Sequence, residues 1–214
     1  MRECGFVQDG DVDLQHVSVR ASPVRRLTQL LAGLALYGAS MGLMVRGALG
    51  LDPWDVLHEA LSERTGLSFG TVTGIIGALV LLCWIPMRQR PGLGTVANIV
   101  LIAVTVDATL ALVSTPSSLW PRIVLLVSGV VLNGLATATY IGVRLGPGPR
   151  DGLMTGLSAR TGVSLRVVRT GIELTVLGVG WFLGGTVGVG TVVYALSIGP
   201  LTQAFLPLVT WRGR

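Results

Sequence analysis

Six apolar stretches of about 20 residues dominate this sequence, and each is long enough to cross a bilayer as an α-helix. They cover residues 27–48, 68–87, 95–113, 123–145, 164–184 and 190–210. Half of the 214 residues are hydrophobic and only 13% are charged, which exceeds what a soluble core of this length needs. Helices satisfy their own backbone hydrogen bonds in lipid. The sequence therefore predicts an all-α, polytopic membrane protein.

The sequence also contains an internal repeat with a constant offset of 96 residues, which pairs Pro53 with Pro149. The first copy reads GLDPWDVLHEALSERTGLS and the second reads GPGPRDGLMTGLSARTGVS. Further identities in the same ungapped register pair Asp55 with Asp151, Leu61 with Leu157, Arg64 with Arg160, Gly66 with Gly162, Gly92 with Gly188 and Gly38 with Gly134. Matches of Pro, Asp, Arg and Gly in one register are rare by chance. We conclude that the chain is a duplication of one three-span unit.

The duplication predicts how the chain is divided. Residues 1–26 form a polar N-terminal tail that we expect to be disordered, and residues 211–214 form a short C-terminal tail. Residues 27–118 make the first membrane repeat and residues 119–210 the second. Because each unit has an odd number of spans, the second copy begins on the opposite side of the membrane. The two repeats are therefore expected to be inverted.

Arginine supplies all 16 basic residues and predicts the orientation. Alternate gaps between the apolar stretches are rich in arginine, and contain Arg2, Arg20, Arg25, Arg26, Arg88, Arg90, Arg144, Arg150, Arg160, Arg166, Arg169, Arg212 and Arg214. The opposite gaps contain only Arg46, Arg64 and Arg122. Loops rich in arginine stay in the cytoplasm, so both termini are predicted to be cytoplasmic. Arginines spread in this way form no basic patch, which argues against a nucleic-acid partner.

A short polar segment follows the first span of each copy and is too short to cross the membrane. In the first copy Asp52 can cap a helix, Pro53 fits the first helical position, and Asp55 complements the positive helix N-terminus. Pro149 and Asp151 fit the same positions in the second copy. The repeated motif therefore predicts a short helix in each repeat.

The first short helix is amphipathic. Trp54, Leu57 and Leu61 fall on one side, and the polar residues, among them His58, fall on the other. Such a helix can lie in the membrane interface, or it can be re-entrant beside a water-filled cavity. The second copy has Arg150 in place of Trp54, a change that suits the cytoplasmic side.

Polar residues inside the predicted spans are the candidate substrate contacts, because polar groups are costly in lipid and usually face protein or water. Asp107 is matched by Gln203 in the repeat register, and Tyr37 is matched by Asn133. Inverted repeats related by an axis in the membrane plane would bring both pairs to a shared centre, where transporters of this kind bind substrate. Asp107 is the candidate site for a coupling proton, and its alternative role is packing against a neighbouring helix.

Two further polar residues are secondary candidates for the pathway. Glu173 has Arg169 one helical turn earlier, so a simple ion pair at the end of a span is its alternative role. Asn98 can equally hold two helices together by hydrogen bonding.

Known catalytic and metal-binding motifs do not occur in the sequence. It contains no HExxH, GxSxG or P-loop pattern and no His and carboxylate cluster at metal-ligand spacing. We therefore expect a protein that is not an enzyme and needs no metal or cofactor.

The repeated segment resembles that of the YczE/YyaS/YitT-type bacterial membrane proteins. Their marker, G-x-x-PWD-x-L after the first span, matches Gly50, Pro53, Trp54, Asp55 and Leu57. The second copy departs from it, having Arg150 in place of the tryptophan. The resemblance covers about residues 27–210 and implies a multi-pass protein of the bacterial cytoplasmic membrane, similar to proteins proposed to export small molecules.

Two functions are compatible with these features. The first is a secondary transporter or exporter of small molecules, driven by an ion gradient because no ATP-binding segment is present. The second is a scaffold or accessory protein that assists a partner enzyme or biosynthetic complex without transporting anything. A polar cavity between the repeats favours the transporter, whereas a fully packed centre favours the scaffold. The sequence does not specify the substrate or the oligomeric state.

Overall fold

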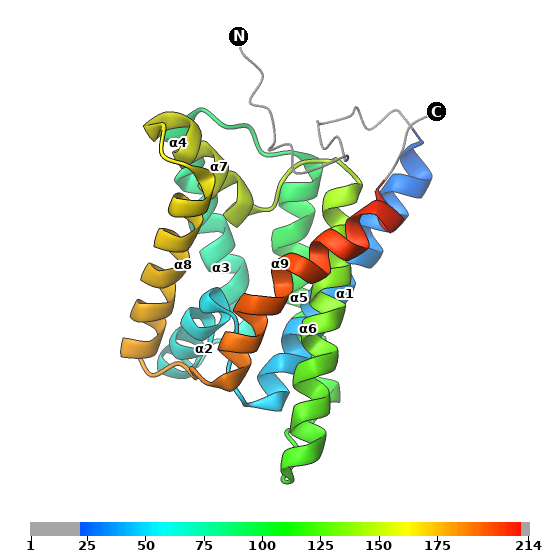
Figure 1. Ribbon diagram of the computed structural model, residues 1–214, viewed down its shortest axis with the longest axis vertical. Helices are drawn as coiled ribbons and strands as arrows, with labels where there is room; N and C mark the ends of the chain where they lie inside the picture. Colours follow the sequence, from blue (N-terminus) through cyan, green and yellow to red (C-terminus); the bar gives the residue numbers. More distant parts are fainter. Residues whose placement is uncertain (1–21, 211–214) are drawn as a thin grey trace.

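The protein is all-helical over residues 22–210, which are the residues that this computed structural model describes (Figure 1). Its helices are α1 (Pro23–Gly47), α2 (Pro53–Thr65), α3 (Phe69–Leu82), α4 (Trp84–Met87), α5 (Leu93–Leu112), α6 (Leu119–Gly142), α7 (Pro149–Thr161), α8 (Leu165–Phe182) and α9 (Val189–Val209). Helix α1 begins within the stretch expected to be the tail. The remainder of that predicted tail, residues 1–21, lies outside the described residues, as do residues 211–214.

Within the described residues, five helical segments are long and apolar enough to cross a membrane. They are α1, α5, α6, α9 and the segment Phe69–Met87, which joins α3 to α4. Helix α8 occupies the remaining predicted stretch and carries Arg166, Arg169 and Glu173 along its 18 residues. The structure therefore establishes a helical membrane protein with five strongly apolar helices and one that is more polar.

Glycines bring the long helices together. Helix α1 packs along both α5 and α6, and α6 packs along α9. A Cβ atom on Gly38 of α1 would overlap Thr105 of α5 and would lie 2.7 Å from the Ile102 carbonyl oxygen. A Cβ atom on Gly134 of α6 would lie 2.7 Å from the Cβ of Leu201 in α9. In both pairs only a glycine permits this approach, as is common between membrane helices.

The linker after the first helix of each copy crosses to the other copy. The Gly94 amide at the start of α5 donates to the Leu145 carbonyl at 3.1 Å. The Gly190 amide at the start of α9 donates to the Leu49 carbonyl at 2.8 Å. These two bonds are related by the 96-residue offset of the sequence repeat. Each copy therefore supplies a backbone carbonyl that accepts a hydrogen bond from the first turn of α5 or α9 in the other copy.

The short helices α2 and α7 cross between the copies in the same way. Helix α2 packs along α8, and α7 contacts α3 and α4. Gly180 of α8 lies so close to α2 that a Cβ would come within 2.6 Å of the Leu57 amide nitrogen. At the corresponding contact, a Cβ on Gly152 of α7 would overlap the Trp84 ring of α4. Figure 1 shows α7 in the upper half of the molecule and α2 in the lower half.

The polar face of α2 points into the protein. Asp55 and His58 are 0% and 1% exposed, whereas Leu57 and Leu61 are only partly buried. Trp54 of the apolar side is buried as well, whereas Glu63 of the polar side is exposed. The buried carboxyls of α2 face a charged partner on α7, and whether the helix is interfacial or re-entrant stays a prediction.

The second long helix of each copy, α3 in the first and α8 in the second, packs differently in the two copies. Helix α3 packs along α5 of its own copy, whereas α8 packs along α2 and makes no comparable contact with α9 among the described residues. The α3–α7 contact is correspondingly looser than the α2–α8 contact. The related sequences of the two copies therefore adopt two different local arrangements.

We predict that Gly38→Ala destabilises the protein by about 1–3 kcal/mol, because the added methyl group must overlap α5. The measurement is the thermal unfolding midpoint of the purified protein in detergent. The matched control is Gly178→Ala in α8, where a Cβ would have no neighbour within 4 Å. The control should unfold at the wild-type temperature or slightly higher, since alanine favours helix. Equal midpoints for the two variants would contradict this account of the α1–α5 contact.

Candidate functional site

The N-termini of α2 and α7 bring Trp54 and Arg150 into contact. The Arg150 guanidinium carbon lies 4.9 Å from the centroid of the Trp54 ring. Each residue directly follows the proline that begins its helix, and the two are related by the repeat offset. The pair therefore lies where equivalent positions of the two copies meet. A guanidinium stacked over an indole is a favourable cation–π contact.

Two carboxyl groups of α2 face the same guanidinium. Nη1 of Arg150 lies 3.9 Å from Oδ1 of Asp52, and Nη2 lies 3.8 Å from Oδ1 of Asp55. Both distances exceed the 2.7–2.9 Å or so of a direct charge-assisted hydrogen bond. Asp52 also caps α2 as predicted, because its Oδ1 accepts from the Trp54 and Asp55 amides at 2.8 and 2.9 Å. The ion pairs are therefore loose while the helix cap is tight.

Arg150, Trp54, Asp52 and Asp55 form a cluster, and His58 extends it along α2. Its Nδ1 lies 3.1 Å from Oδ1 of Asp55 and 3.3 Å from the Thr73 hydroxyl of α3. All three side chains are buried. The sequence placed His58 on the polar side of α2, but it gave no sign that this side is enclosed by the rest of the protein.

Polar atoms without a hydrogen-bond partner are concentrated in this cluster. Among the described residues, four such buried atoms belong to it: Oδ2 of Asp52, Nε1 of Trp54, Oδ2 of Asp55 and Nε2 of His58. Buried polar groups are normally paired, and exceptions are typical of functional positions. Three of these atoms are potential acceptors, so the cluster offers binding capacity to a proton or to a hydrogen-bond donor.

A cavity of about 70 Å³ adjoins the Arg150–Trp54 contact. It lies between α3, α5 and α7, and its polar wall includes Tyr37, Asn98, Tyr140, Arg150 and Asp151. The Tyr140 hydroxyl donates to Oδ2 of Asp151 at 2.7 Å. The Tyr140 ring packs edge-on against the Tyr37 ring, with 6.0 Å between the ring centroids. The volume accommodates a few water molecules or a very small solute. The helices therefore enclose a small cavity with a partly polar wall.

Asn133 belongs to a neighbouring hydrogen-bond network. Its amide nitrogen donates to the Ser40 hydroxyl at 2.9 Å, and its amide oxygen accepts from the Tyr194 hydroxyl at 3.1 Å. These bonds join α6 to α1 and α9. Asn133 therefore links helices beside the cavity, as polar residues between membrane helices often do.

Asp107 and Gln203 do not join the centre, which corrects their predicted position. Asp107 caps the first turn of α3, accepting from the Ser68 hydroxyl at 2.5 Å and the Gly70 amide at 2.7 Å. It borders an open depression of about 500 Å³ that does not include Tyr37 or Asn133. Gln203 lies on the exposed surface of α9. The repeat register matches equivalent positions without fixing how deep in the bundle each one lies, and a pathway role for either residue stays a prediction.

The secondary candidates have separate outcomes. Asn98 lines the cavity. Glu173 accepts from Nε of Arg169 at 2.9 Å, which is the ion pair that was its alternative role. Both members of this pair are partly exposed on α8.

Sequence reasoning missed Arg150 and Tyr140 as members of the site. The replacement of Trp54 by Arg150 in the second copy was the available signal, because a charge at a position otherwise repeated had to find a partner. The replacement suggested membrane orientation instead. The carboxyls that face Arg150 belong to the other copy, so the sequence around Arg150 does not reveal them. Tyr140 lies near the end of an apolar stretch, where a tyrosine is unremarkable.

We predict that Arg150→Met lowers the stability of the protein by about 3 kcal/mol, because it leaves two buried carboxyls without their cation. Arg150→Lys keeps the charge and should lose much less. The double variant Arg150→Met with Asp55→Asn should recover part of the loss. Thermal unfolding in detergent at neutral pH measures all three. Wild-type stability of Arg150→Met would show that the ion pairs do not support the fold.

Comparison with known proteins identifies relatives over most of the chain. A Haemophilus influenzae protein, named "Uncharacterized protein", is 38% identical over 90% of this chain and 88% of its own length. The "Uncharacterized membrane protein YczE" of Bacillus subtilis is 37% identical over 86% of each chain. The Bacillus subtilis protein YyaS is 28% identical over 83% of this chain and 90% of its own length.

No solved structure matches the chain. The model of one protein family matches residues 24–207, which include every helix of the cluster and the cavity. Together with the two Bacillus subtilis relatives, this match confirms the resemblance to YczE and YyaS. The chain belongs to the family of unknown function DUF6198.

Proposed function

We propose that this protein is a secondary transporter of small molecules in the bacterial cytoplasmic membrane. The observation that carries the proposal is the cluster in which buried Asp52, Asp55 and His58 meet the partly exposed Arg150 beside a cavity with a partly polar wall. A buried charged cluster is an expensive feature for a membrane protein and is normally kept for function. It lies where the two copies meet, which is where transporters built from repeats bind their substrates.

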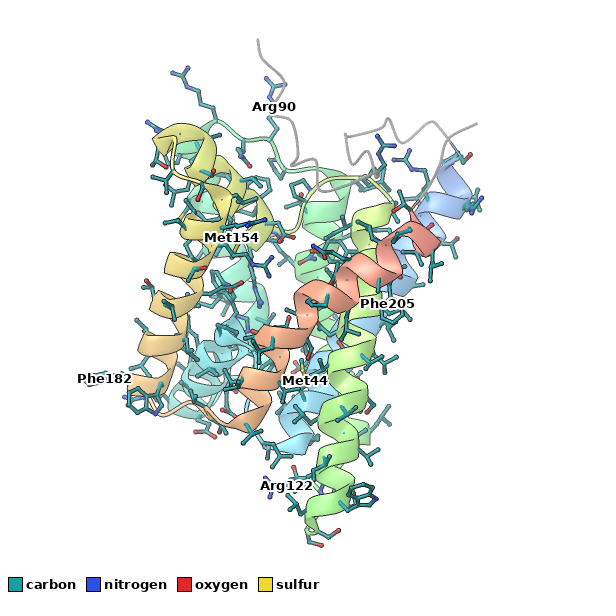
Figure 2. The ribbon with its side chains drawn as sticks, viewed as in Figure 1. Met44, Arg90, Arg122, Met154, Phe182 and Phe205 are labelled. Atoms are coloured by element: carbon teal, nitrogen blue, oxygen red, sulfur yellow. The ribbon has the colours of Figure 1, made fainter. Side chains whose placement is uncertain are left out.

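The proposal includes six spans in two inverted three-span units, with α8 as the fifth span. Pairing of Arg169 with Glu173 reduces the cost of placing α8 in the membrane. The crossed bonds from Gly94 and Gly190 follow the repeat offset, as two units related by a twofold axis would require. Arg90 and Arg122 lie at opposite ends of the molecule (Figure 2), and the arginine-rich end is the cytoplasmic one in this proposal.

The unequal packing of the two copies supplies a mechanism for exposing the site to each side in turn. The cavity lies on the side of the loose α3–α7 contact, whereas the equivalent α2–α8 contact is tight. If the copies exchange arrangements, α8 moves from α2 onto α9, and α3 moves from α5 towards α7. The cavity then closes on the α7 side and opens on the α2 side. Gly199 of α9 has no neighbour within 4 Å of a Cβ position, so its surface is available to α8.

Two cysteine pairs test this exchange. A Cβ on Gly74 would lie 3.6 Å from the Cβ of Ala103, within the roughly 3.5–4.5 Å span of a disulfide, so this pair reports the present arrangement. The repeat offset assigns Thr170 and Gly199 as the corresponding pair for the exchanged arrangement. In a background without the native cysteines, we predict that each pair forms a disulfide in membranes. Cross-linking of Gly74→Cys with Ala103→Cys alone would support a static scaffold instead.

Transport itself can be tested in energised everted vesicles incubated with the low-molecular-weight fraction of a bacterial cell extract. Mass spectrometry of the washed vesicles should reveal at least one compound enriched by the wild-type protein, and a protonophore should abolish the enrichment. Arg150→Lys and Asp55→Asn should reduce it to the level of vesicles without the protein. Asp107→Asn, which keeps an acceptor for the α3 cap, should behave as wild type.

Equal contents in wild-type and protein-free vesicles, at confirmed expression and membrane insertion, would refute the transporter proposal for the compounds present in the extract. Loss of transport in Asp107→Asn, with normal thermal stability, would return Asp107 to the pathway and contradict the site described above.

A further inference from the structure

Buried polar atoms without a hydrogen-bond partner in Asp52, Asp55 and His58 indicate what these three residues bind. We infer that Asp52, Asp55 and His58 form a proton-binding site, and that the coupling ion of the transporter is a proton held there. The inference rests on the proposed function for its coupling role, whereas occupation of the site by a proton can be measured without any transport.

The first argument is the balance of charge. Asp52 and Asp55 are both buried, and Oδ1 of Asp52 accepts from the Asp55 amide at 2.9 Å. Arg150 is the one guanidinium within 4 Å of either carboxyl among the described residues. Two carboxylates with one cation leave an excess negative charge in a low-dielectric environment, which is costly. A single shared proton removes the excess, as in other closely paired carboxyl groups.

Within residues 22–210, no second cation lies within 4 Å of either carboxyl to replace that proton. The Thr73 hydroxyl of α3 lies 3.3 Å from Nδ1 of His58, and Tyr37 of α1 and Tyr194 of α9 lie near enough to interact electrostatically with both carboxyls. From α7, Asp151 adds a further carboxyl, which is hydrogen-bonded to Tyr140 of α6. On α8, Arg169 is paired with Glu173. On α2 itself, Glu59 accepts from the Thr186 amide at 2.6 Å. Arg150 is therefore the permanent cation of the cluster.

The second argument is the arrangement of acceptors. Oδ1 of Asp52 is occupied by two backbone amides and Oδ1 of Asp55 by His58, but Oδ2 of each carboxyl has no partner. A carboxylate can only accept hydrogen bonds, so each buried Oδ2 without a donor is costly. Protonation converts one of them into a donor and removes one negative charge from the pair. The geometry is thus suited to one proton for the pair.

His58 provides a route for that proton. In the neutral ring with hydrogen on Nδ1, the free Nε2 is an acceptor, and the Nδ1–H points at Asp55. A proton that binds Nε2 forms a new N–H bond there, while the Nδ1–H bond breaks and its proton joins the Asp55 carboxylate. The ring is then neutral again in its other tautomer, and Asp55 is neutral. One proton has entered, and the net charge of the cluster has risen by one.

Arg150 connects the proton to the cavity. It faces the two carboxyls and also forms part of the cavity wall. Neutralising Asp55 weakens the already loose ion pair and releases the guanidinium towards the cavity. Proton occupancy therefore changes the charge that a substrate meets, which is the physical requirement for coupling.

The proton can be observed by infrared difference spectroscopy of the purified protein in detergent, as the C=O stretch of a protonated carboxyl that shifts in D₂O. We predict such a band in the wild-type protein at neutral pH, and its loss on titration to alkaline pH. Asp52→Asn and Asp55→Asn should each abolish it at neutral pH. Asparagine at position 52 retains an acceptor for the α2 cap, and asparagine at position 55 retains an acceptor for Nδ1 of His58, so both variants should fold. Glu63→Gln, at an exposed position of α2, is the matched control and should retain the band.

Absence of the band from the wild-type protein, or its persistence in both aspartate variants, would overturn the inference whatever the transport assay shows. A band with the predicted behaviour in a protein that fails the vesicle assay would leave the proton site established and would refute the transport proposal. Thermal unfolding of each variant verifies that loss of the band is not loss of the fold.

Discussion

The contact of Arg150 with Trp54 and with the carboxyls of Asp52 and Asp55 is the interaction on which the centre of this protein depends. Charged groups at depth in a membrane protein must find partners within the protein, because lipid offers none. Here the cation comes from one copy and the anions come from the other. Neither copy could bury its own short helix at this position without the other, so the duplication and the charged centre are physically inseparable.

The same mutual dependence extends to the backbone. The linker of each copy accepts a hydrogen bond from the first turn of the third helix of the other, through Leu49 and Leu145. Gly152 lets α7 approach α4, which continues α3 of the other copy, and Gly180 lets α8 approach α2 of the other copy. Contacts made by backbone and glycine leave little side-chain interlocking to oppose sliding. This kind of interface is compatible with two alternative packings of related helices, which is the property that the proposed mechanism requires.

Much of the fold could be predicted because it depends on local patterns. Apolar length predicted the long helices, and Asp52 with Pro53 predicted where α2 begins, since a side-chain cap and a proline at the first position act within one turn. The site was less predictable. Of the residues expected to meet at the centre, Tyr37 lines the cavity and Asn133 lies in the neighbouring network, whereas Asp107 caps α3 and Gln203 lies on the exposed surface of α9. Repeat register pairs residues that are equivalent, but equivalence does not determine which of them approach one another.

The sequence by itself determined a helical membrane protein, its duplication, and the helices with their caps, because apolar length, repeat register and capping act along the chain. Only the tertiary structure decided that the polar face of α2 is enclosed and that Arg150 is its partner. It also decided that the two copies pack differently. The physical reason is that burial and charge pairing depend on segments about 100 residues apart, and an amphipathic pattern looks the same whether its polar side faces water or a buried guanidinium.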